Sequence, residues 1–165
     1  MAPTKDGRGY WLVGSDGGVF AFGTAPFKGS MGGKPLNAPV ARMAPTASGN
    51  GYWLVARDGG VFGFGDAPFH GSLGNTRLNA PVIDIDIAPD GAGYWMTAED
   101  GGVFAFGSAV FHGSLANTRL DGRITSMAPM PDGGGYWLTG CDGGVFTFGN
   151  AKFFGSDPRY GCRGT

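Results

Sequence analysis

The sequence has few charged residues and little of what catalysis or metal binding usually requires. Charged side chains make up 15% of its 165 residues, against about 25% in typical soluble domains. Histidine and cysteine occur twice each, and Glu99 is the single glutamate. Two cysteines cannot form a tetrahedral zinc site without other ligands. The net charge of −1 provides no broad basic surface, so nucleic acid is not a predicted partner.

The sequence also lacks a long apolar segment. No apolar run approaches the roughly 18 residues that a membrane-spanning helix needs, so membrane insertion is not predicted. The residues after Met1 do not combine a positive start with an apolar stretch, and no export signal is therefore visible. No segment combines helical periodicity with helix caps, which argues against helices.

Glycine, with 34 residues, and aromatic side chains, at 13%, are abundant. This combination predicts tight turns between aromatic strands, because disordered chains lack aromatic residues. Gly-Tyr-Trp occurs four times with a constant spacing of 42 residues, and Asp-Gly-Gly-Val-Phe follows each copy. All four tryptophans occupy this one position, which indicates packing anchors: Trp11, Trp53, Trp95 and Trp137.

Each repeat is predicted to contain four β-strands. The first is an apolar stretch such as Val82–Ile87, the second is exemplified by Gly51–Ala56, and the third by residues 61–64. An Asp-Gly-Gly turn joins the second and third strands, since Asp-Gly between apolar runs is a strong hairpin signal. A short fourth strand is expected near residues 69–72.

The second strand is apolar on both faces, which predicts a sheet that is covered on both sides. Stacking such sheets around an axis gives a propeller, so the predicted fold is an all-β single domain over residues 1–165, a four-bladed β-propeller with blades of about 42 residues. The predicted units span about 1–38, 39–80, 81–122 and 123–165. A fragment of a larger propeller, or a β-solenoid, is the alternative fold.

The two ends of the chain depart from the repeat. The chain begins inside the first strand of a unit, and the tail 159–165 lies where a next unit would supply the missing half. The tail is expected to pair beside the first blade and latch the ring, unless the chain is a fragment of a longer array. Cys141 and Cys162 are exceptions to the repeat, and they form either a disulfide that pins the tail or two free thiols.

Carboxylates replace other residue types on the first strand of the third unit. If the first strands line a central channel, alternation puts Asp84 and Asp86 on one face with Arg42 as a neighbour. These three residues predict either a cation or water cluster in the channel or a solvated Arg–Asp pair, and no other cofactor is expected. A hydrolase using these carboxylates is an alternative, although two adjacent aspartates on one strand cannot easily flank a bond.

A second group of polar residues recurs on the connecting loops. The loops of the second and third units carry Asn-Thr-Arg, and a histidine precedes each loop at an equivalent position. Such groups beside aromatic rings could bind sugar hydroxyls between blades, and equivalent sites on a ring would give avidity. The alternative is a polar connecting loop. The predicted ligand-binding residues are His70, Asn75, Arg77, His112, Asn117 and Arg119.

The string Gly-Tyr-Trp-Leu-Val-x-x-Asp-Gly-Gly-Val-Phe-x-Phe-Gly-x-Ala, followed by Phe-x-Gly-Ser, resembles a repeat common in large secreted proteins of actinobacteria. There it often accompanies cell-wall hydrolase or other extracellular domains. The resemblance covers nearly the whole chain. It implies a secreted or cell-surface accessory module with propeller-like repeats, and it carries no catalytic residues with it.

Three functions are compatible with these observations. The first is a non-catalytic, lectin-like binding module that recognises carbohydrate or a protein partner at the cell surface. The second is a hydrolase that uses the channel carboxylates. The third is a structural or engineered repeat scaffold without a ligand. The symmetric repeat and the missing catalytic set favour the first, although a fold alone does not dictate a function.

Overall fold

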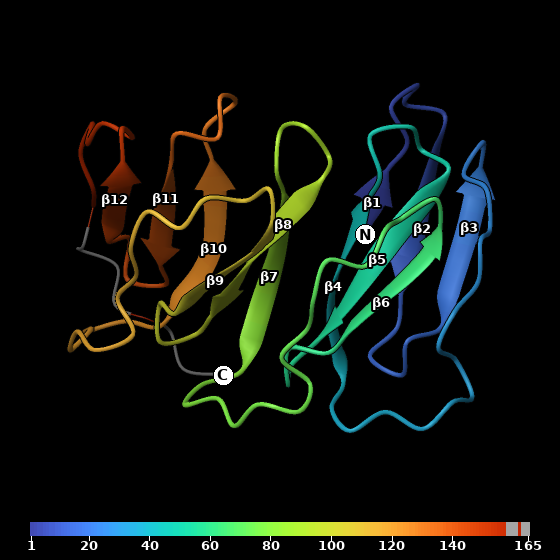
Figure 1. The fold of residues 1–165 in the computed structure, drawn as a ribbon, viewed down its shortest axis with the longest axis horizontal. Helices are drawn as coiled ribbons and strands as arrows, with labels where there is room; N and C mark the ends of the chain where they lie inside the picture. Colours follow the sequence, from blue (N-terminus) through green and yellow to red (C-terminus); the bar gives the residue numbers. More distant parts are fainter. Residues whose placement is uncertain (158–161, 163–165) are drawn as a thin grey trace. The chain divides into compact units, whose positions relative to one another are not determined.

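The computed structural model describes residues 1–157 and residue 162. These residues form twelve β-strands in four three-stranded sheets, and the part of the chain described contains no helix (Figure 1). Accordingly, no helix long and apolar enough to cross a membrane is present among them. The chain divides into two compact units, Met1–Leu78 and Asn79–Thr165. Each unit holds two sheets and is described by itself.

In every sheet the strands follow one another in chain order and neighbours run antiparallel. The first unit contains β1 (Ala2–Pro3), β2 (Gly9–Val13), β3 (Val19–Gly23), β4 (Val40–Pro45), β5 (Gly51–Ala56) and β6 (Val61–Gly65). The second unit contains β7 (Val82–Ile87), β8 (Gly93–Ala98), β9 (Val103–Gly107), β10 (Ile124–Pro129), β11 (Gly135–Gly140) and β12 (Val145–Gly149). The all-β class is confirmed, and β7 and β5 have the predicted bounds.

The Asp-Gly-Gly segments form the turns between the second and third strands of each sheet. In the β5–β6 turn, Asp58 Oδ1 accepts a hydrogen bond from the Gly60 N–H at 2.9 Å. Gly59 adopts a φ of 79°, which costs glycine little because it has no Cβ. The same aspartate bond recurs at 2.9–3.0 Å for Asp16, Asp100 and Asp142. The predicted turn role of these four aspartates is confirmed.

The expected fourth strand does not form within the described residues. Residues 69–72 and their equivalents are irregular, and the sheets have three strands each. One glycine in each of these segments has a strongly positive φ: Gly29 (134°), Gly71 (141°), Gly113 (130°) and Gly155 (123°). Extended strands need negative φ, so this glycine ends the regular ladder. The prediction of four strands per unit is wrong for this reason.

The two faces of a middle strand carry different side chains. In β5, Tyr52 and Leu54 lie on one face, and Trp53 and Val55 lie on the other, because successive residues alternate. We call these the Tyr face and the Trp face, and the names apply to the equivalent positions of every sheet. Directly paired residues share a face, so Phe64, the β6 partner of Tyr52, extends the Tyr face.

Within each unit, the Trp face of one sheet packs on the Tyr face of the next. The ring centroids of Trp11 and Tyr52 are 5.9 Å apart, and those of Trp95 and Tyr136 are 6.1 Å apart. Both pairs lie inside cores completed by aliphatic residues. Aromatic side chains of this size bury a large apolar area, and each Å² removed from water contributes about 25 cal/mol. The repeated Tyr–Trp contact is therefore the main packing unit of both cores.

A disulfide joins Cys141 and Cys162, with a Cα–Cα distance of 5.0 Å. Cys141 lies in the β11–β12 turn, where its N–H donates to the Arg123 carbonyl at 2.9 Å. The disulfide thus ties residue 162 to the turn of the fourth sheet. The remainder of the tail, which was expected to latch against the first sheet, falls at residues 158–161 and 163–165, outside the described residues.

Candidate functional site

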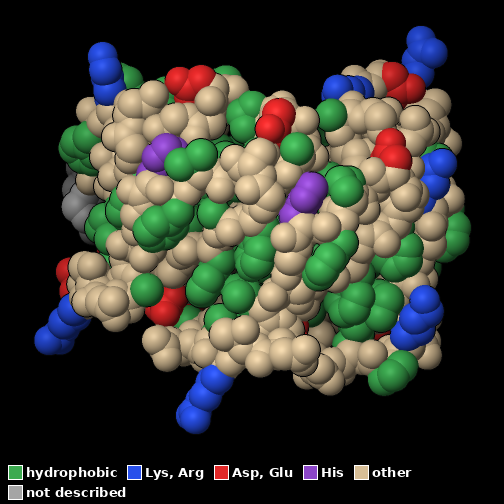
Figure 2. Space-filling model, in the orientation of Figure 1, with side chains coloured by type: hydrophobic (Ala, Val, Ile, Leu, Met, Phe, Trp, Pro, Cys, Tyr) green, Lys and Arg blue, Asp and Glu red, His purple; other side chains and the backbone are tan. Residues whose placement is uncertain are grey.

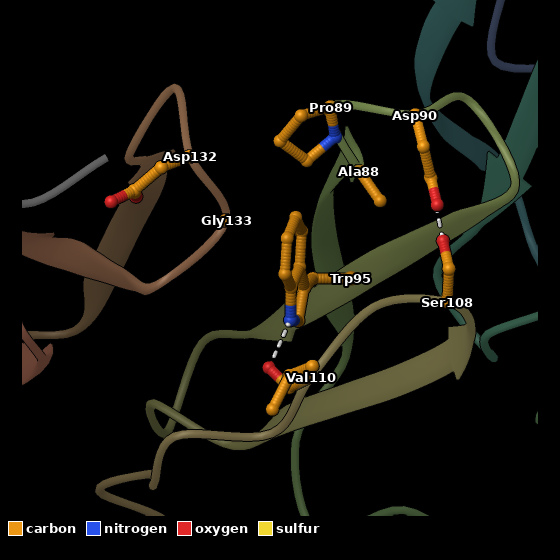
Figure 3. Close-up of a pocket in the computed structure, with 8 residues that line it drawn as sticks. All are labelled: Ala88, Pro89, Asp90, Trp95, Ser108, Val110, Asp132 and Gly133. Carbon is orange, nitrogen blue, oxygen red and sulfur yellow. Dashed lines mark hydrogen bonds between the residues drawn. The ribbon is translucent and has the colours of Figure 1, made fainter.

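A pocket of about 170 Å³ lies between the two sheets of the second unit (Figure 3). Four segments line it: the β7–β8 turn, strand β8, the segment after β9 and the β10–β11 turn. The pocket-lining residues are Ala88, Pro89, Asp90, Trp95, Ser108, Val110, Asp132 and Gly133. Turns of two neighbouring sheets thus meet over one tryptophan.

Asp90 stands on one side of the pocket in a fixed orientation (Figure 3). Its Oδ1 accepts a hydrogen bond from the Ser108 hydroxyl at 2.7 Å and from the Ala92 N–H at 2.9 Å. The first bond joins the β7–β8 turn to the segment after β9, and the second is the local Asx-type bond of a tight turn. The carboxylate and the hydroxyl are therefore held together at the rim as one polar group.

Asp132 lies in the β10–β11 turn on the other side of the pocket, and its carboxylate points away from Trp95 (Figure 3). Its Oδ1 accepts the Gly134 N–H at 2.9 Å, and its Oδ2 accepts the Asn150 side-chain amide at 3.3 Å. The Gly134 bond, followed by the Asn150 amide and the nearby His112 charge, holds the pKa of Asp132 below its ordinary value. Asp132 is consequently ionised at neutral pH and can act only as an acceptor.

Trp95 forms the apolar wall of the pocket. Its side chain is 1% exposed, so the indole contacts the pocket with an edge rather than with an open face. Its Nε1–H donates to the Val110 carbonyl at 2.8 Å (Figure 3). The same bond to the residue 15 positions later occurs from Trp11, Trp53 and Trp137, at 2.7–2.9 Å. The wall is rigid because the indole is both packed and hydrogen-bonded.

The first unit has the same pocket at the equivalent place, with a volume of about 420 Å³. All positions of the pocket in the second unit recur 84 residues earlier, which is twice the repeat length. The equivalent residues are Thr4, Lys5, Asp6, Trp11, Thr24, Pro26, Ser48 and Gly49, and Asn50 is added. The pocket is thus a property of the repeat and not of one irregular loop.

Asp6 plays the part of Asp90 in the first unit. Its Oδ1 accepts the Thr4 hydroxyl at 2.5 Å and the Thr24 hydroxyl at 3.0 Å, and also the Arg8 N–H at 3.0 Å. The Thr4 bond, and then the Arg8 bond, lower the pKa of this exposed carboxyl. Both units therefore pair an aspartate with a hydroxyl group from the segment after the third strand.

The chemistry of the pocket is suited to binding. The Ser108 hydroxyl donates to the Asp90 carboxylate, and this bond is not the serine–histidine pair typical of a serine nucleophile. Among residues 1–157 and 162, no cluster of three or more histidine, cysteine, aspartate or glutamate side chains could hold a metal ion. An aspartate and a hydroxyl group beside an apolar wall are a combination that can orient a small polar ligand.

His112, a predicted ligand-binding residue, lies between the sheets next to this pocket. Its Nε2 is 2.9 Å from the Gly133 carbonyl oxygen, and its backbone N–H donates to the Tyr136 hydroxyl at 3.1 Å. Its ring packs edge-on against Tyr136, with 5.6 Å between the centroids. These contacts give His112 a structural role in the interface between the third and fourth sheets. His112 therefore lies beside the pocket and does not form part of its rim.

The predicted partners of His112 on the third unit's loop lie at the other end of the sheets. The Leu115 N–H donates to the Gly101 carbonyl at 2.9 Å, which holds this loop against the β8–β9 turn. His112 contacts the β10–β11 turn, at the opposite strand ends. Asn117 and Arg119 are exposed. The structure therefore does not bring His112 together with these two residues, because the chain crosses the sheet between them.

In the first unit, Asn75 lines a separate pocket of about 230 Å³ together with Asn37 and Asp58. Arg77 is exposed and His70 is half-buried. Figure 2 shows the lysine and arginine side chains on the viewed face as isolated projections rather than as one patch. Binding by Asn75 and Arg77 stays a prediction.

Asp84 and Asp86 lie on one face, as alternation predicts. Asp84 pairs with Thr97 and Asp86 with Trp95, so both carboxylates lie on the Trp face, which packs on the fourth sheet. Asp84 is 5% exposed, which makes it a poor candidate for direct contact with a substrate. Arg42 lies on β4 in the first unit. The central channel and its cation stay predictions.

Sequence reasoning missed the residues of the pocket. It assigns Trp95 to packing alone and gives no role to Asp90, Ser108 or Asp132. A signal is nevertheless present, because the turn between the first two strands carries a hydrogen-bonding side chain at one fixed position of every unit: Asp6, Ser48, Asp90 and Asp132. That neighbouring copies of this turn share a pocket depends on which sheets pack together.

Comparison with known proteins finds no match to a family model and none to a curated protein. The function is therefore inferred from the residues of the pocket.

Proposed function

We propose that the protein is a non-catalytic binding module that takes carbohydrate in the pockets between its sheets. The observation that carries this proposal is the recurrence of one pocket, position for position, in both units. Because the pocket belongs to the repeat, a ligand that binds one copy finds an equivalent pocket in the other unit. Both copies keep an aspartate hydrogen-bonded to a hydroxyl group.

The polar groups of the pocket match the chemistry of a sugar. Asp90 with Ser108, and Asp6 with Thr24, each combine a carboxylate acceptor with a hydroxyl group. A sugar hydroxyl can donate to the carboxylate or to the serine or threonine oxygen, whose own hydrogen is already donated to the aspartate. Hydrogen bonds to an ionised acceptor are the stronger ones. Trp95 and Trp11 are 1% and 0% exposed, so they support the pocket from behind and the polar groups at the rim are expected to make the contacts.

Two such pockets along one chain suit a polymer with repeated sugar units. Each pocket is small and open, so a single contact is expected to be weak. Linked sites raise the effective concentration at the next site and multiply the overall affinity. The sheets are best explained as blades of a β-propeller, a fold that stacks three- or four-stranded sheets radially and repeats its sites around an axis.

A secreted or cell-surface location agrees with this function. A disulfide such as Cys141–Cys162 persists in oxidising compartments and is rare in the cytosol. The resemblance to secreted repeat proteins points the same way. Polymeric carbohydrate is abundant outside the cell, where such a module would meet it.

The experiment is a glycan-array screen followed by titration with the best soluble oligosaccharide. Asp90→Ala with Asp6→Ala is expected to weaken binding by at least tenfold, because the acceptor of each pocket is removed. Asp121→Ala, which removes an exposed carboxylate outside the pockets, is the matched control and should bind as the wild type does. A second control is Arg77→Ala with Arg119→Ala.

Three results would contradict the proposal. Absence of binding to any glycan would favour a scaffold without a ligand. Binding that survives the pocket variants and disappears with Arg77→Ala and Arg119→Ala would move the site to the loops. Release of reducing sugar during incubation, abolished by Asp84→Asn, would favour the hydrolase. Thermal unfolding of every variant establishes that a lost signal is not lost folding.

A further inference from the structure

The first unit carries another pocket at the opposite ends of its strands. Strand β5 begins next to Asn50, which lines the carbohydrate pocket of this unit, and ends at Ala56, which lines the other pocket. The second pocket has a volume of about 230 Å³, and all of its lining residues belong to the first unit. We call it the Asp58 pocket. It shares no lining residue with the carbohydrate pockets.

Of the side chains that line the Asp58 pocket, that of Asp58 alone is charged. It is half-buried, and its Oδ1 accepts the Gly60 N–H at 2.9 Å. Its Oδ2 has no hydrogen-bond or ion-pair partner within residues 1–157 and 162. Lys34 and Arg57 are near in sequence, but neither lines the pocket. The pocket therefore offers a negatively charged acceptor to a ligand.

The ring of Phe62 lies beside this carboxylate. A Cβ on the buried Gly60 would be 3.0 Å from Asp58 Oδ1 and 3.7 Å from Cε2 and Cζ of Phe62. The carboxylate and the ring thus border the same small space. A carboxylate attracts a cation directly, and an aromatic ring attracts a cation through its quadrupole. This combination favours a positively charged ligand.

Two asparagine side chains at the edge of the pocket supply further acceptors. Asn37 lies on the loop that joins the two sheets, Asn75 lies on the loop after β6, and both are exposed. Neither side-chain amide is hydrogen-bonded to another residue in the described part of the chain. Their carbonyl oxygens and Asp58 Oδ2 are acceptors, and a primary ammonium group has three N–H donors to match them.

Other charged ligands match this pocket less well. A calcium ion takes about six to eight oxygen ligands, several of them from carboxylates, and the lining contains one carboxylate. An anion would be repelled by Asp58. The remaining walls include the apolar side chains of Pro35 and Val61, along which an alkyl chain can lie. The lining therefore suits a cation that is attached to an apolar stem.

In the second unit, the disulfide lies against the equivalent turn. Asp142 Oδ1 accepts the Gly144 N–H at 3.0 Å, which is the same turn bond. At Gly122, the equivalent of Ala38, a Cβ would lie 2.8 Å from Asp142 Cγ and 2.9 Å from Cys162 Sγ. The sulfur therefore fills space beside Asp142, and the second unit provides a matched turn with a different surrounding.

We propose that the Asp58 pocket binds a primary ammonium group on an alkyl stem, the chemistry of a lysine side chain. The ammonium donates to Asp58 Oδ2 and to the carbonyl oxygens of Asn37 and Asn75. The stem lies against Phe62 and Val61. A peptide or protein segment that presents an exposed lysine is the partner with this chemistry. This binding is independent of carbohydrate binding.

The first test is titration of the oxidised full chain with Nα-acetyl-lysine methylamide, followed by amide signals in ¹H–¹⁵N NMR spectra. The Gly60 N–H and the side-chain amides of Asn37 and Asn75 should shift and saturate, whereas the Gly144 N–H should not shift. Acetylation of the probe at Nε removes its charge, so the acetylated probe should bind about tenfold more weakly. Equal binding of the two probes would exclude recognition of an ammonium group.

The second test compares variants of the two matched turns. Asp58→Asn removes the charge, while an asparagine can keep the turn bond, and about tenfold weaker binding of the lysine probe is expected. Asp142→Asn makes the same change in the second unit and should bind as the wild type does. Phe62→Leu should weaken binding about threefold, because the ring is lost. Asp6→Ala with Asp90→Ala should leave lysine binding unchanged, so a failure of either site is recognised separately.

Three outcomes overturn the proposal. Absence of saturable shifts up to the solubility limit of the probe shows that the pocket takes no ammonium. Equal affinities of Asp58→Asn and Asp142→Asn remove the special role of Asp58. Glucosamine binding as tightly as the lysine probe excludes a role of the alkyl stem. Thermal unfolding shows whether each variant is folded, and if Asp58→Asn is not, Phe62→Leu and the acetylated probe on the wild type decide.

Discussion

The second sheet and the first sheet have nearly the same sequence on their middle strands but different surroundings. Tyr52 is 0% exposed and holds two hydrogen bonds to the preceding sheet, whereas its equivalent Tyr10 is 40% exposed. Leu54 and Leu12 differ in the same way. The comparison shows that the repeat encodes two complementary faces, and that the Tyr face is buried where the Trp face of a neighbouring sheet in the same unit covers it.

Truncation of Tyr52 and of Tyr10 to alanine should give the largest difference in stability between the two equivalent positions. Tyr52→Ala removes a buried ring beside Trp11 and is expected to lower the free energy of unfolding by about 3–5 kcal/mol. Tyr10→Ala should change it by less than about 0.5 kcal/mol in a dilute solution of single chains. Urea unfolding followed by tryptophan fluorescence measures both. Equal losses would contradict the difference in packing.

The fourth sheet differs from the first by having a covalent tether. Cys162→Ser opens a loop with a sequence separation of 21 residues, and the chain-entropy model gives a loss of about 3 kcal/mol. The measurement is urea unfolding of the variant and of the wild type with and without reductant. Reductant should lower the wild type to the level of Cys162→Ser and leave the variant unchanged. Unchanged unfolding of reduced wild type would contradict a stabilising tether.

Removal of the tyrosine hydroxyl group alone tests the same difference between a covered and an uncovered Tyr face. Tyr136→Phe deletes the bonds to Gly113 and from His112 and should cost about 1 kcal/mol, the net value of a typical hydrogen bond. Tyr10→Phe should cost nothing measurable in the single chain. Thermal unfolding at low protein concentration distinguishes them. A Tyr10→Phe loss as large as that of Tyr136→Phe would show that Tyr10 already bonds within its own chain.

Acid titration should give the smallest effect. Hydrogen bonds in the folded chain lower the pKa of Asp6 and of Asp132. A lowered folded pKa contributes stability above the ordinary aspartate value of about 3.9, and this stability is lost as the pH falls through the folded pKa. Asp132→Asn should therefore reduce the fall in melting temperature that the wild type shows as the pH drops below 4. An acid profile of Asp132→Asn identical to that of the wild type would exclude this role.

The strand pattern of each sheet could be predicted from the sequence. Val82–Ile87 and Gly51–Ala56 are strands with the expected bounds, because apolar runs and Asp-Gly turns are local signals. The fourth strand could not be excluded in the same way. The segment around Phe69 looks like a strand in composition, and only the φ of Gly71 shows that its backbone turns away from the ladder.

The candidate pocket could not be predicted from local sequence patterns. Asp90 and Asp132 each resemble an ordinary turn residue, and their common pocket depends on one sheet packing against the next. His112 illustrates the same limit of local sequence patterns, because its hydrogen bond to the Gly133 carbonyl joins one sheet to the next. Loop residues that are neighbours in sequence, such as His112 and Asn117, lie at opposite ends of the strands. The sequence-based prediction of one binding site therefore combined residues that are close in sequence but lie at opposite ends of the strands.

The constant spacing of the repeat has a consequence for how such a chain can change over evolutionary time. Every sheet offers a Tyr face on one side and a Trp face on the other, and the two sheets within each unit meet through the same Trp–Tyr contact. Duplication or excision of one in-frame block of 42 residues would preserve the match between the faces that it brings together. Copy number can consequently vary by unequal recombination without redesign of the core, and each gained block brings the parts of another pocket with it.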